Sequence, residues 1–366
     1  MYENDKRIVM TLDAGGTNFV FSAVQGCREI ITPIALPAVA DNLTECLNGL
    51  VDGFTQVMDS LPEKPAAISF AFPGPADYEH GVIGDLPNFP AFRGGVALGP
   101  FLSEQFGMPV YINNDGNLFA YGEALAGVLP LINAQLQAAG NPRRYKNLLG
   151  ITLGTGFGAG VVIDNRLLTG DNGCGGDVWL MRNKKYADLI AEESVSIRAV
   201  RRVYGELSGE PADNLTPKDI YDIAEGTRSG NSEAAKKSFE ELGEVAGAAV
   251  VQALDIVDGI VVIGGGVAGA AKYILPGMMR EMRSTLSTFG GASFPCLQSE
   301  VYNLTEEAEL TTFLESKSVL VSIPRFGSRT VYNRSKKIGV TLSSLGTNRA
   351  ICLGAYAYAL AQLDIE

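Results

Sequence analysis

The feature that most constrains this chain is an apolar run that ends in an acid, turns over two glycines and starts again. Residues 8–24 have the sequence IVMTLDAGGTNFVFSAV, with Asp13 ending the first run and Gly15 and Gly16 in the turn. Two short apolar runs joined in this way predict a buried strand, a tight turn and a second strand. Because glycine permits positive φ and a close approach of the backbone to a ligand, the N–H groups of this turn are a candidate phosphate cradle.

Two common nucleotide motifs do not fit this turn. No Gly-Lys-Ser/Thr follows, so it is not a Walker loop, and it leads into a strand rather than a helix, so it is not a dinucleotide fingerprint. An ordinary Gly-Gly hairpin remains the alternative when the motif is taken alone. A carboxylate at the mouth of the turn, as Asp13 is, suits a magnesium ion held directly or through water.

A second copy of the pattern favours the phosphate cradle over an ordinary hairpin. Residues 148–163, LLGITLGTGFGAGVVI, again form an apolar run, a glycine turn (Gly154, Thr155, Gly156) and an apolar run. Two such units, each opening an α/β half, predict duplicated lobes whose turns grip a nucleotide across a central cleft. This layout resembles that of actin-like ATPases and hexokinases.

Polar residues follow a later strand. A strand predicted at 109–113 runs into Asn113, Asn114 and Asp115, and a helix is expected directly afterwards. The carboxyl ends of strands are where open α/β folds bind ligands. Asp115 could also be only a helix N-cap, although the segment is more polar than a cap requires. In either case the helix N-terminus predicts a lowered pKa for Asp115.

A third glycine turn, Gly264, Gly265 and Gly266, follows a strand predicted at 260–263. With Gly269 it matches G-x-G-x-x-G, but the acid expected about twenty residues on, at the end of a strand, falls inside a helix predicted over 273–286. We therefore favour a turn that contacts the adenosine part of a nucleotide. Residues 297–340 show no clear pattern. Further helices are predicted over 42–61, 98–106, 192–204, 233–254 and 353–363.

Length, charge and cysteine content restrict the class of protein. The 366 residues suffice for two domains, and a net charge of −12 without a long basic cluster argues against a nucleic-acid partner. Five scattered cysteines indicate reduced thiols. The start of the chain leaves no room for a signal peptide, and the most apolar run, 259–271, is too short to span a bilayer. We expect a cytoplasmic protein without a membrane partner.

Taken together, five segments resemble those of the ROK family of sugar kinases and sugar-responsive repressors, in the same order and over nearly the whole chain. They are residues 13–18 and 153–158 (two phosphate motifs), 114–117 with Gly122-Glu123 beyond (the Asn-Asp-x-Asn segment), 264–267 (the adenosine turn) and 344–355 (the closing segment). The resemblance implies an α/β fold of two actin-like, ribonuclease H-like lobes of mixed sheet and helices around a central cleft. The smaller lobe would be 1–125 joined by the helix 353–366, and the larger 126–352.

The resemblance also implies roles for individual residues. Asp115 would be the general base for a sugar hydroxyl, usually that on carbon 6, in a phosphoryl transfer that depends mainly on positioning and charge neutralisation. Asn114 would bind a neighbouring hydroxyl, and Asp13 the magnesium ion. The remaining assignments are Asn88, Asp177 and Glu192 to the sugar, Gly15, Gly16, Thr17, Gly154, Thr155 and Gly156 to the phosphates, and Gly264, Gly265 and Gly266 to the adenosine of ATP.

The chain departs from the family at one place. Typical members have Glu-x-Gly-His followed by a cysteine cluster, and the histidine with three cysteines holds zinc. Here Asp177 replaces the glutamate and Trp179 the histidine, no cysteine follows Cys174 until Cys296, and the single histidine is His80. Since structural zinc needs four ligands, we expect none. Trp179 could stack on a sugar or pack in the core, and packing is favoured.

The leading hypothesis is an ATP- and magnesium-dependent kinase that phosphorylates a hexose or an N-acetylhexosamine on O6. The main alternative is a sugar-binding ROK-type regulator without kinase activity, although family repressors place a DNA-binding domain before the first phosphate motif and only twelve residues precede Asp13. A nicotinamide oxidoreductase and a catalytically idle sugar binder are further alternatives. The identity of the sugar stays open, and residues 297–340 are a possible homodimer interface.

Overall fold

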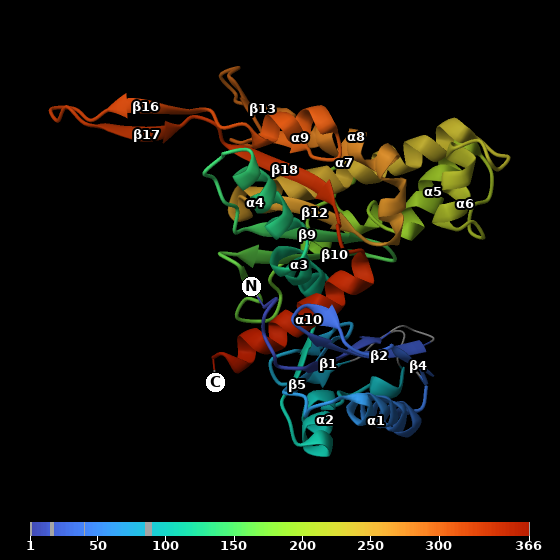
Figure 1. The fold of residues 1–366 in the computed structure, drawn as a ribbon. Helices are drawn as coiled ribbons and strands as arrows, with labels where there is room; N and C mark the ends of the chain where they lie inside the picture. Colours follow the sequence, from blue (N-terminus) through green and yellow to red (C-terminus); the bar gives the residue numbers. More distant parts are fainter. Residues whose placement is uncertain (1, 15–17, 40, 85–89, 366) are drawn as a thin grey trace. The chain divides into compact units, whose positions relative to one another are not determined.

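The computed structural model describes residues 2–14, 18–39, 41–84 and 90–365 of the chain. The chain forms two compact units (Figure 1). Unit 1 comprises Met1–Val128, Gly160–Gly176 and Ser344–Glu366, and unit 2 comprises Leu129–Ala159 and Asp177–Ser343. Compared with the predicted smaller lobe, unit 1 also takes in Gly160–Gly176 and begins its C-terminal part at Ser344. The predicted division into lobes, 1–125 with 353–366 and 126–352, stays a prediction.

Unit 1 is built on a six-stranded mixed sheet with the order β3-β2-β1-β5-β8, in which β4 also pairs with β2. The predicted hairpin is present, because β1 and β2 are antiparallel, while β1, β5 and β8 run parallel. The strands are β1 (Val9–Ala14), β2 (Asn18–Gln25), β3 (Arg28–Glu29), β4 (Ile34–Pro37), β5 (Ala67–Ala71) and β8 (Val110–Asn113), and a small separate hairpin consists of β6 (Ala76–Asp77) and β7 (Val82–Ile83).

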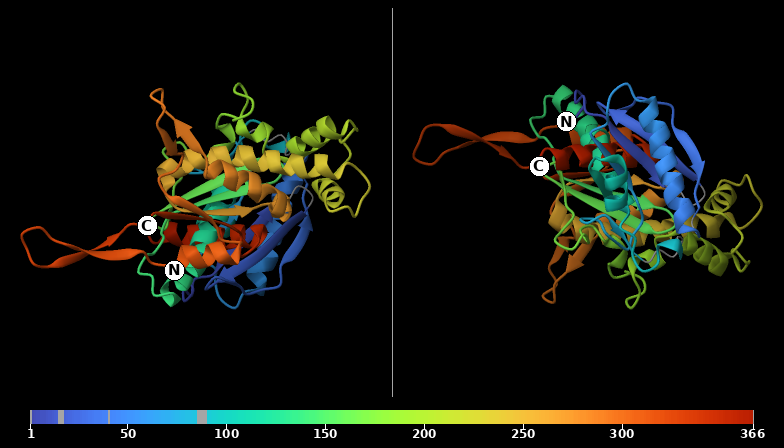
Figure 2. Two further views of the ribbon diagram at one scale, coloured as in Figure 1. Left: turned by 90° about the horizontal axis from the view of Figure 1, so that it is seen from above. Right: turned by 90° about the horizontal axis from the view of Figure 1, so that it is seen from below.

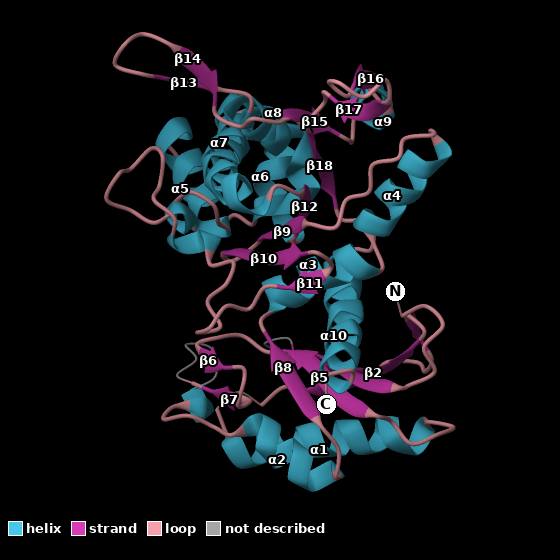
Figure 3. Cartoon of the chain, turned by 90° about the vertical axis from the view of Figure 1, so that its left-hand side faces the viewer, coloured by secondary structure: helices cyan, strands magenta, loops and turns pink. Residues whose placement is uncertain are grey.

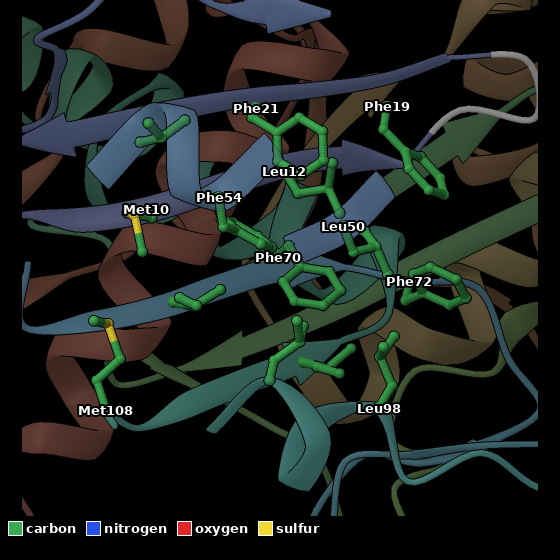
Figure 4. Packing of buried hydrophobic residues seen from close by; sticks show 14 of the residues in the cluster. Met10, Leu12, Phe19, Phe21, Leu50, Phe54, Phe70, Phe72, Leu98 and Met108 are labelled. Carbon is green, nitrogen blue, oxygen red and sulfur yellow. The ribbon is translucent and has the colours of Figure 1, made fainter. Parts of the chain in front are cut away.

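Both faces of the centre of this sheet are buried, which explains why β1 and β5 are almost uninterrupted apolar runs. Met10 and Leu12 point to the face covered by α1 (Leu43–Ser60) and α2 (Leu98–Phe106), where they join a cluster rich in phenylalanine, including Phe54 and Phe70 (Figure 4). Val9, one residue away, points to the other face and packs with Tyr356 of α10 (Thr347–Leu363). The helices of unit 1 are α1 (Leu43–Ser60), α2 (Leu98–Phe106), α3 (Asp115–Leu125) and α10 (Thr347–Leu363), with a 3-10 turn η1 (Pro90–Phe92).

The second six-stranded sheet has the order β11-β10-β9-β12-β18-β15. Its strands β9, β12, β18 and β15 are parallel, so the plan of the first sheet recurs, with β9 and β10 in the places of β1 and β2. The strands are β9 (Leu148–Leu153), β10 (Phe157–Ile163), β11 (Arg166–Leu167), β12 (Ile260–Gly264), β15 (Glu300–Asn303) and β18 (Lys337–Leu342).

Helices and two hairpins complete unit 2. The helices are α4 (Val128–Ala138, whose first residue belongs to unit 1), α5 (Ile197–Ser208), α6 (Pro217–Ala224), α7 (Ser232–Val257), α8 (Ala271–Met282) and α9 (Glu307–Leu314), with 3-10 turns η2 (Val178–Leu180), η3 (Ala191–Glu193) and η4 (Gly266–Ala270). The hairpins β13–β14 (Thr285–Ser287, Ser293–Pro295) and β16–β17 (Ser318–Ser322, Arg329–Asn333) project from unit 2 in different directions (Figures 2 and 3).

Some predicted helix boundaries were wrong. The helix expected over 273–286 ends at Met282, because residues 285–287 pair with β14 instead. The helix expected from residue 192 begins at Ile197, where Ser196 caps its N-terminus. Residues 297–340, for which no pattern was found in the sequence, contain β15, α9, the two strands β16 and β17 of a long hairpin, and most of β18. Among the described residues, no helix is long and apolar enough to cross a membrane.

Candidate active site

Asp115 stands where β8 ends and α3 begins. The N-cap of α3 is Asn114, whose side-chain oxygen accepts a hydrogen bond from the Gly116 N–H at 2.8 Å. Behind it, the buried Asn113 Oδ1 accepts from the Asn114 N–H at 2.8 Å and from Asn117 Nδ2 at 3.0 Å. The alternative that Asp115 is merely the cap is therefore wrong, since Asn114 holds that position and Asp115 is the first helical residue.

The expected lowering of the Asp115 pKa is also wrong. Its side chain keeps contact with solvent, yet protein surrounds it densely, and this loss of hydration raises the pKa of the carboxyl group. A hydrogen bond from the Gly116 N–H to Asp115 Oδ1, at 2.8 Å, acts in the opposite direction but is the smaller effect. A carboxylate with a raised pKa is a better proton acceptor near neutral pH than an ordinary aspartate.

The sheet register brings the other predicted acid to the same edge of unit 1. Asp13 of β1 lies opposite Ala71 of β5, and Ala71 lies opposite Asn113 of β8. Two strand spacings separate Asp13 from Asn113, about 10 Å. The Asp13 side chain reaches solvent, but the protein around it removes part of its hydration, and this desolvation raises its pKa. The predicted ligand residues Gly15, Gly16, Thr17 and Asn88 lie outside the described residues.

Helix α3 is held against α10 by glycines from two of the recognised motifs. A Cβ on Gly354 would stand 1.8 Å from the Leu118 carbonyl oxygen, and a Cβ on Gly122 would stand 1.9 Å from the Ala350 carbonyl oxygen. Only glycine permits so close a crossing. The closing segment 344–355 therefore supports the helix that carries Asp115, a relation that the motif spacing did not reveal.

A buried acid strengthens this support. Glu123, which has no exposed surface, accepts hydrogen bonds from the Val128 N–H at 2.8 Å, the Ser344 hydroxyl at 3.2 Å and the Leu345 N–H at 3.2 Å. It thereby fixes the end of α3 and the entry to α10. Sequence reasoning missed this role, and the only signal for it was the Gly-Glu pair that closes the Asn-Asp-x-Asn segment.

The second glycine turn, Gly154–Gly156, lies in unit 2 and joins β9 to β10, of which residues 160–163 belong to unit 1. Gly154 donates its N–H to the Gly156 carbonyl at 3.1 Å and accepts from the Ile197 N–H at 2.9 Å, which ties the turn to α5. Thr155 is exposed, and a Cβ on Gly154 would meet no atom within 4 Å. The outer side of this turn is therefore open to a ligand.

Glu192, predicted to bind the sugar, lies against the second turn. Its Oε2 accepts a hydrogen bond from the Phe157 N–H at 3.0 Å, and its Oε1 accepts from Arg198 at 2.9 Å. A Cβ on Gly156 would stand 2.5 Å from Oε2. Gly156 therefore makes room for this carboxylate, a reason that the motif alone did not suggest.

The third turn lies beside the second, because β9 and β12 are neighbouring parallel strands that pair Gly264 with Thr152. Gly265 has φ +90°, and a Cβ there would stand 2.2 Å from the Leu153 carbonyl oxygen. The structure thus brings Gly154–Gly156 and Gly264–Gly266 to one edge of the second sheet. The 3-10 turn η4 follows, so α8 begins only at Ala271, unlike the helix of a dinucleotide fingerprint.

The segment that departs from the family is exposed. Asp177 is exposed and precedes η2. Trp179 has 36% of its surface exposed, so the expectation that it packs in the core was wrong. The reason is local, because a single 3-10 turn buries one side chain of three, here Val178. His80 pairs with Asp77 at 2.8 Å on the β6–β7 hairpin. Within the described part of the chain, no cluster of three or more His, Cys, Asp or Glu side chains is arranged to hold a metal.

Two α/β units, each with a pair of sequential strands beside parallel strands, form the two-lobed mixed α/β fold that was predicted, and a solved hexokinase structure from Thermus thermophilus shares this fold at 19% identity and a TM-score of 0.66, over 97% of this chain and 99% of that one. The chain belongs to the ROK family, whose sequence profile matches residues 9–299. It is 29% identical over 290 residues to the glucokinase of Thermotoga maritima, covering 74% of this chain and 85% of that one. It is 25% identical over 286 residues to the xylose repressor of Caldicellulosiruptor bescii, covering 73% and 66%.

Solved structures agree with this placement. The chain is similar to the crystal structure of a glucokinase from Parabacteroides distasonis, with 61% identity, a TM-score of 0.89 and 99% of both chains covered. It also shares its fold, at 18% identity and a TM-score of 0.60, with a ROK family glucokinase from Streptomyces griseus solved with glucose and AMPPNP, over 96% of this chain and 98% of that one.

Proposed function

We propose that this protein is a sugar kinase that transfers the terminal phosphoryl group of ATP to a hexose or N-acetylhexosamine, at O6. The observation that carries the proposal is Asp115, a carboxylate of raised pKa at the carboxyl edge of the first sheet. The similarity to two proteins described as glucokinases supports the same activity.

In the proposed mechanism, Asp115 orients the sugar hydroxyl and accepts its proton as the bond to phosphorus forms. The transition state of phosphoryl transfer is loose, so the proton leaves late and the base needs position more than strength. Asn114 caps α3 with its oxygen, and we assign its amide nitrogen to a neighbouring sugar hydroxyl. The contacts of Gly122, Gly354 and Glu123 keep α3 in place.

We assign the remaining ligand contacts by turn. The phosphates of ATP are assigned to Gly15, Gly16 and Thr17 and to Gly154, Thr155 and Gly156, and the adenosine to Gly264, Gly265 and Gly266. The open outer side of Gly154 and the exposed Thr155 support the second of these assignments. The sugar contacts are assigned to Asn88, Asp177 and Glu192.

Asp13 fits a magnesium ion. The protein around this carboxyl group removes part of its hydration and raises its pKa, and a divalent cation would offset the cost of a negative charge there. Magnesium is commonly held by one or two carboxylates together with substrate phosphates. When bound, it would neutralise charge on the phosphates, while Asp13 itself would hold and orient it.

The similarity to a xylose repressor makes a sugar-binding regulator the second candidate. The kinase is better supported, because the glucokinase structure matches 99% of both chains, whereas 66% of the repressor is covered. We further propose a cytoplasmic location, which the five free cysteines support, and a homodimer.

The decisive experiment is a coupled assay of ADP release over a panel of hexoses and N-acetylhexosamines, with magnesium present. We expect one sugar to be strongly preferred, the product to be the 6-phosphate by phosphorus NMR, and the Asp115→Asn variant to be nearly inactive. Calorimetric binding of a sugar without ADP release from any of them would favour the regulator instead.

A further inference from the structure

The hairpin β16–β17 with its flanking residues, 316–336, forms an arm that projects from unit 2 (Figures 1 and 2). Its register pairs Leu320 with Val331, which places both on one face, and pairs Val319 with Tyr332 on the other. Leu320 and Val331 are each 62% exposed, and Phe326 at the tip is 68% exposed. A two-stranded hairpin that exposes apolar side chains on both faces is at best marginally stable in water. We therefore expect a binding partner to cover the arm.

The arm has the opposite charge to the rest of the chain. It contains five of the 29 basic residues and none of the 41 acidic ones, which leaves 24 basic and 41 acidic residues, a net charge of −17, on the remainder. The basic residues of the arm are Lys317, Arg325, Arg329, Arg334 and Lys336. The positive charge of the arm is therefore complementary to the negative net charge of a second copy of the same chain.

The base of the arm is fixed by buried polar contacts. Lys337, which is 3% exposed, donates from Nζ to the carbonyl oxygens of Phe313 at 3.2 Å and Glu315 at 2.9 Å, at the C-terminal end of α9, where the chain enters the arm. Where the chain leaves the arm, the Tyr145 hydroxyl donates to the Lys337 carbonyl at 2.7 Å and Arg143 donates to the Ser335 carbonyl at 3.2 Å. The arm is therefore presented in a defined direction, which reduces the ordering cost of binding.

We infer that the arm mediates dimerisation by binding the acidic body, meaning the residues outside 316–336, of a second copy of this chain. Pairing of one arm with the other would bring five positive charges against five, so binding of each arm to the partner's body is favoured. Apolar side chains such as Leu320 and Val331 supply the buried core of the contact, and Arg325 and Arg329 surround it with charge. This inference is independent of the proposed kinase activity.

Sedimentation velocity of the full chain tests the inference. At concentrations of about 1–50 μM we expect a dimer, whose dissociation constant rises as NaCl is raised from about 0.05 to 0.5 M. Leu320→Glu with Val331→Glu should weaken the dimer at least about tenfold, and Arg325→Glu with Arg329→Glu should also weaken it. Leu207→Glu, at a leucine 50% exposed on α5, is the matched control and should leave the dimer unchanged.

Circular dichroism of each variant checks that it is folded. A dimer that strengthens with salt, or on charge reversal of the arm, would show arm-to-arm pairing and overturn the inference. A monomeric parent, or a dimer insensitive to both arm variants, would overturn it as well. So would a monomer that binds duplex DNA through the arm, because the basic hairpin would then be a nucleic-acid contact.

Discussion

Glu192 Oε2 accepts a hydrogen bond from the Phe157 backbone N–H at 3.0 Å, directly after the second glycine turn. A side chain assigned to the sugar thus also braces the turn assigned to phosphate. Its other oxygen binds Arg198, which also binds the adjacent Glu193, at 2.7 Å. Both acids share the arginine, and Glu192 in addition accepts the hydrogen bond beside the turn, so the pair offers a matched comparison.

Glu192→Ala should raise KM for both ATP and the sugar, by about tenfold or more, because a charge-assisted hydrogen bond is worth about 1.5–3 kcal/mol. Glu193→Ala should change both constants less than about twofold, since an exposed ion pair contributes little. Steady-state kinetics with each substrate varied in turn measure this. Equal effects of the two variants would mean that the turn does not depend on Glu192.

Asp115→Asn should lower kcat by about 10²–10⁴-fold and leave sugar affinity nearly unchanged. The amide can still hydrogen-bond the sugar hydroxyl but cannot accept its proton. Isothermal titration with the preferred sugar and the coupled assay measure the two properties separately. Turnover within a few-fold of the parent would contradict the assignment of Asp115 as the base.

The raised pKa of Asp115 predicts two pH effects. Because the base must be deprotonated, the acid limb of kcat/KM should lie above the ordinary aspartate pKa of about 3.9. The folded state favours protonated Asp115, so its contribution to stability is fully present below the ordinary pKa and is lost as pH rises through the raised one. Asp115→Asn should therefore raise Tm at pH 7 and have no effect in acid. A lower Tm at neutral pH would contradict the direction of the shift.

Gly354→Ala should destabilise the protein by about 3 kcal/mol, because the new Cβ would meet the Leu118 carbonyl oxygen and force α10 away from α3. Gly49→Ala is the control, since it lies within α1 and its Cβ would meet no atom within 4 Å. That change should stabilise by about 0.5–1 kcal/mol. Denaturation midpoints of the two variants are the measurement, and similar shifts would show that the helix crossing tolerates a side chain.

Purified protein should hold well below one zinc per chain, because Asp177 and Trp179 replace the glutamate and histidine that the family resemblance implies for a zinc site, and Cys174 has no cysteine near it in sequence. Elemental analysis after dialysis against a weak chelator measures the content. Stoichiometric zinc, with a Tm that falls on its removal, would contradict the prediction.

Local patterns in the sequence determined the main elements of this protein. The strands around Asp13 and Gly154 are continuous apolar runs because both faces of their sheets are buried, and helices such as α1 and α7 show the periodicity of one buried face. The third glycine turn was predictable from its own residues, since Gly265 has φ +90° and lies close to the Leu153 backbone, and only glycine tolerates both. The ROK relationship followed from the order of these motifs.

Only the tertiary structure decided what those residues touch. The capping role fell to Asn114 rather than Asp115, the surrounding protein raised the Asp115 pKa against the helix dipole, and Trp179 stayed exposed. The contact between Gly354 and Leu118 joins segments more than two hundred residues apart. Burial, desolvation and packing depend on neighbours that are distant along the chain, and no local pattern encodes them.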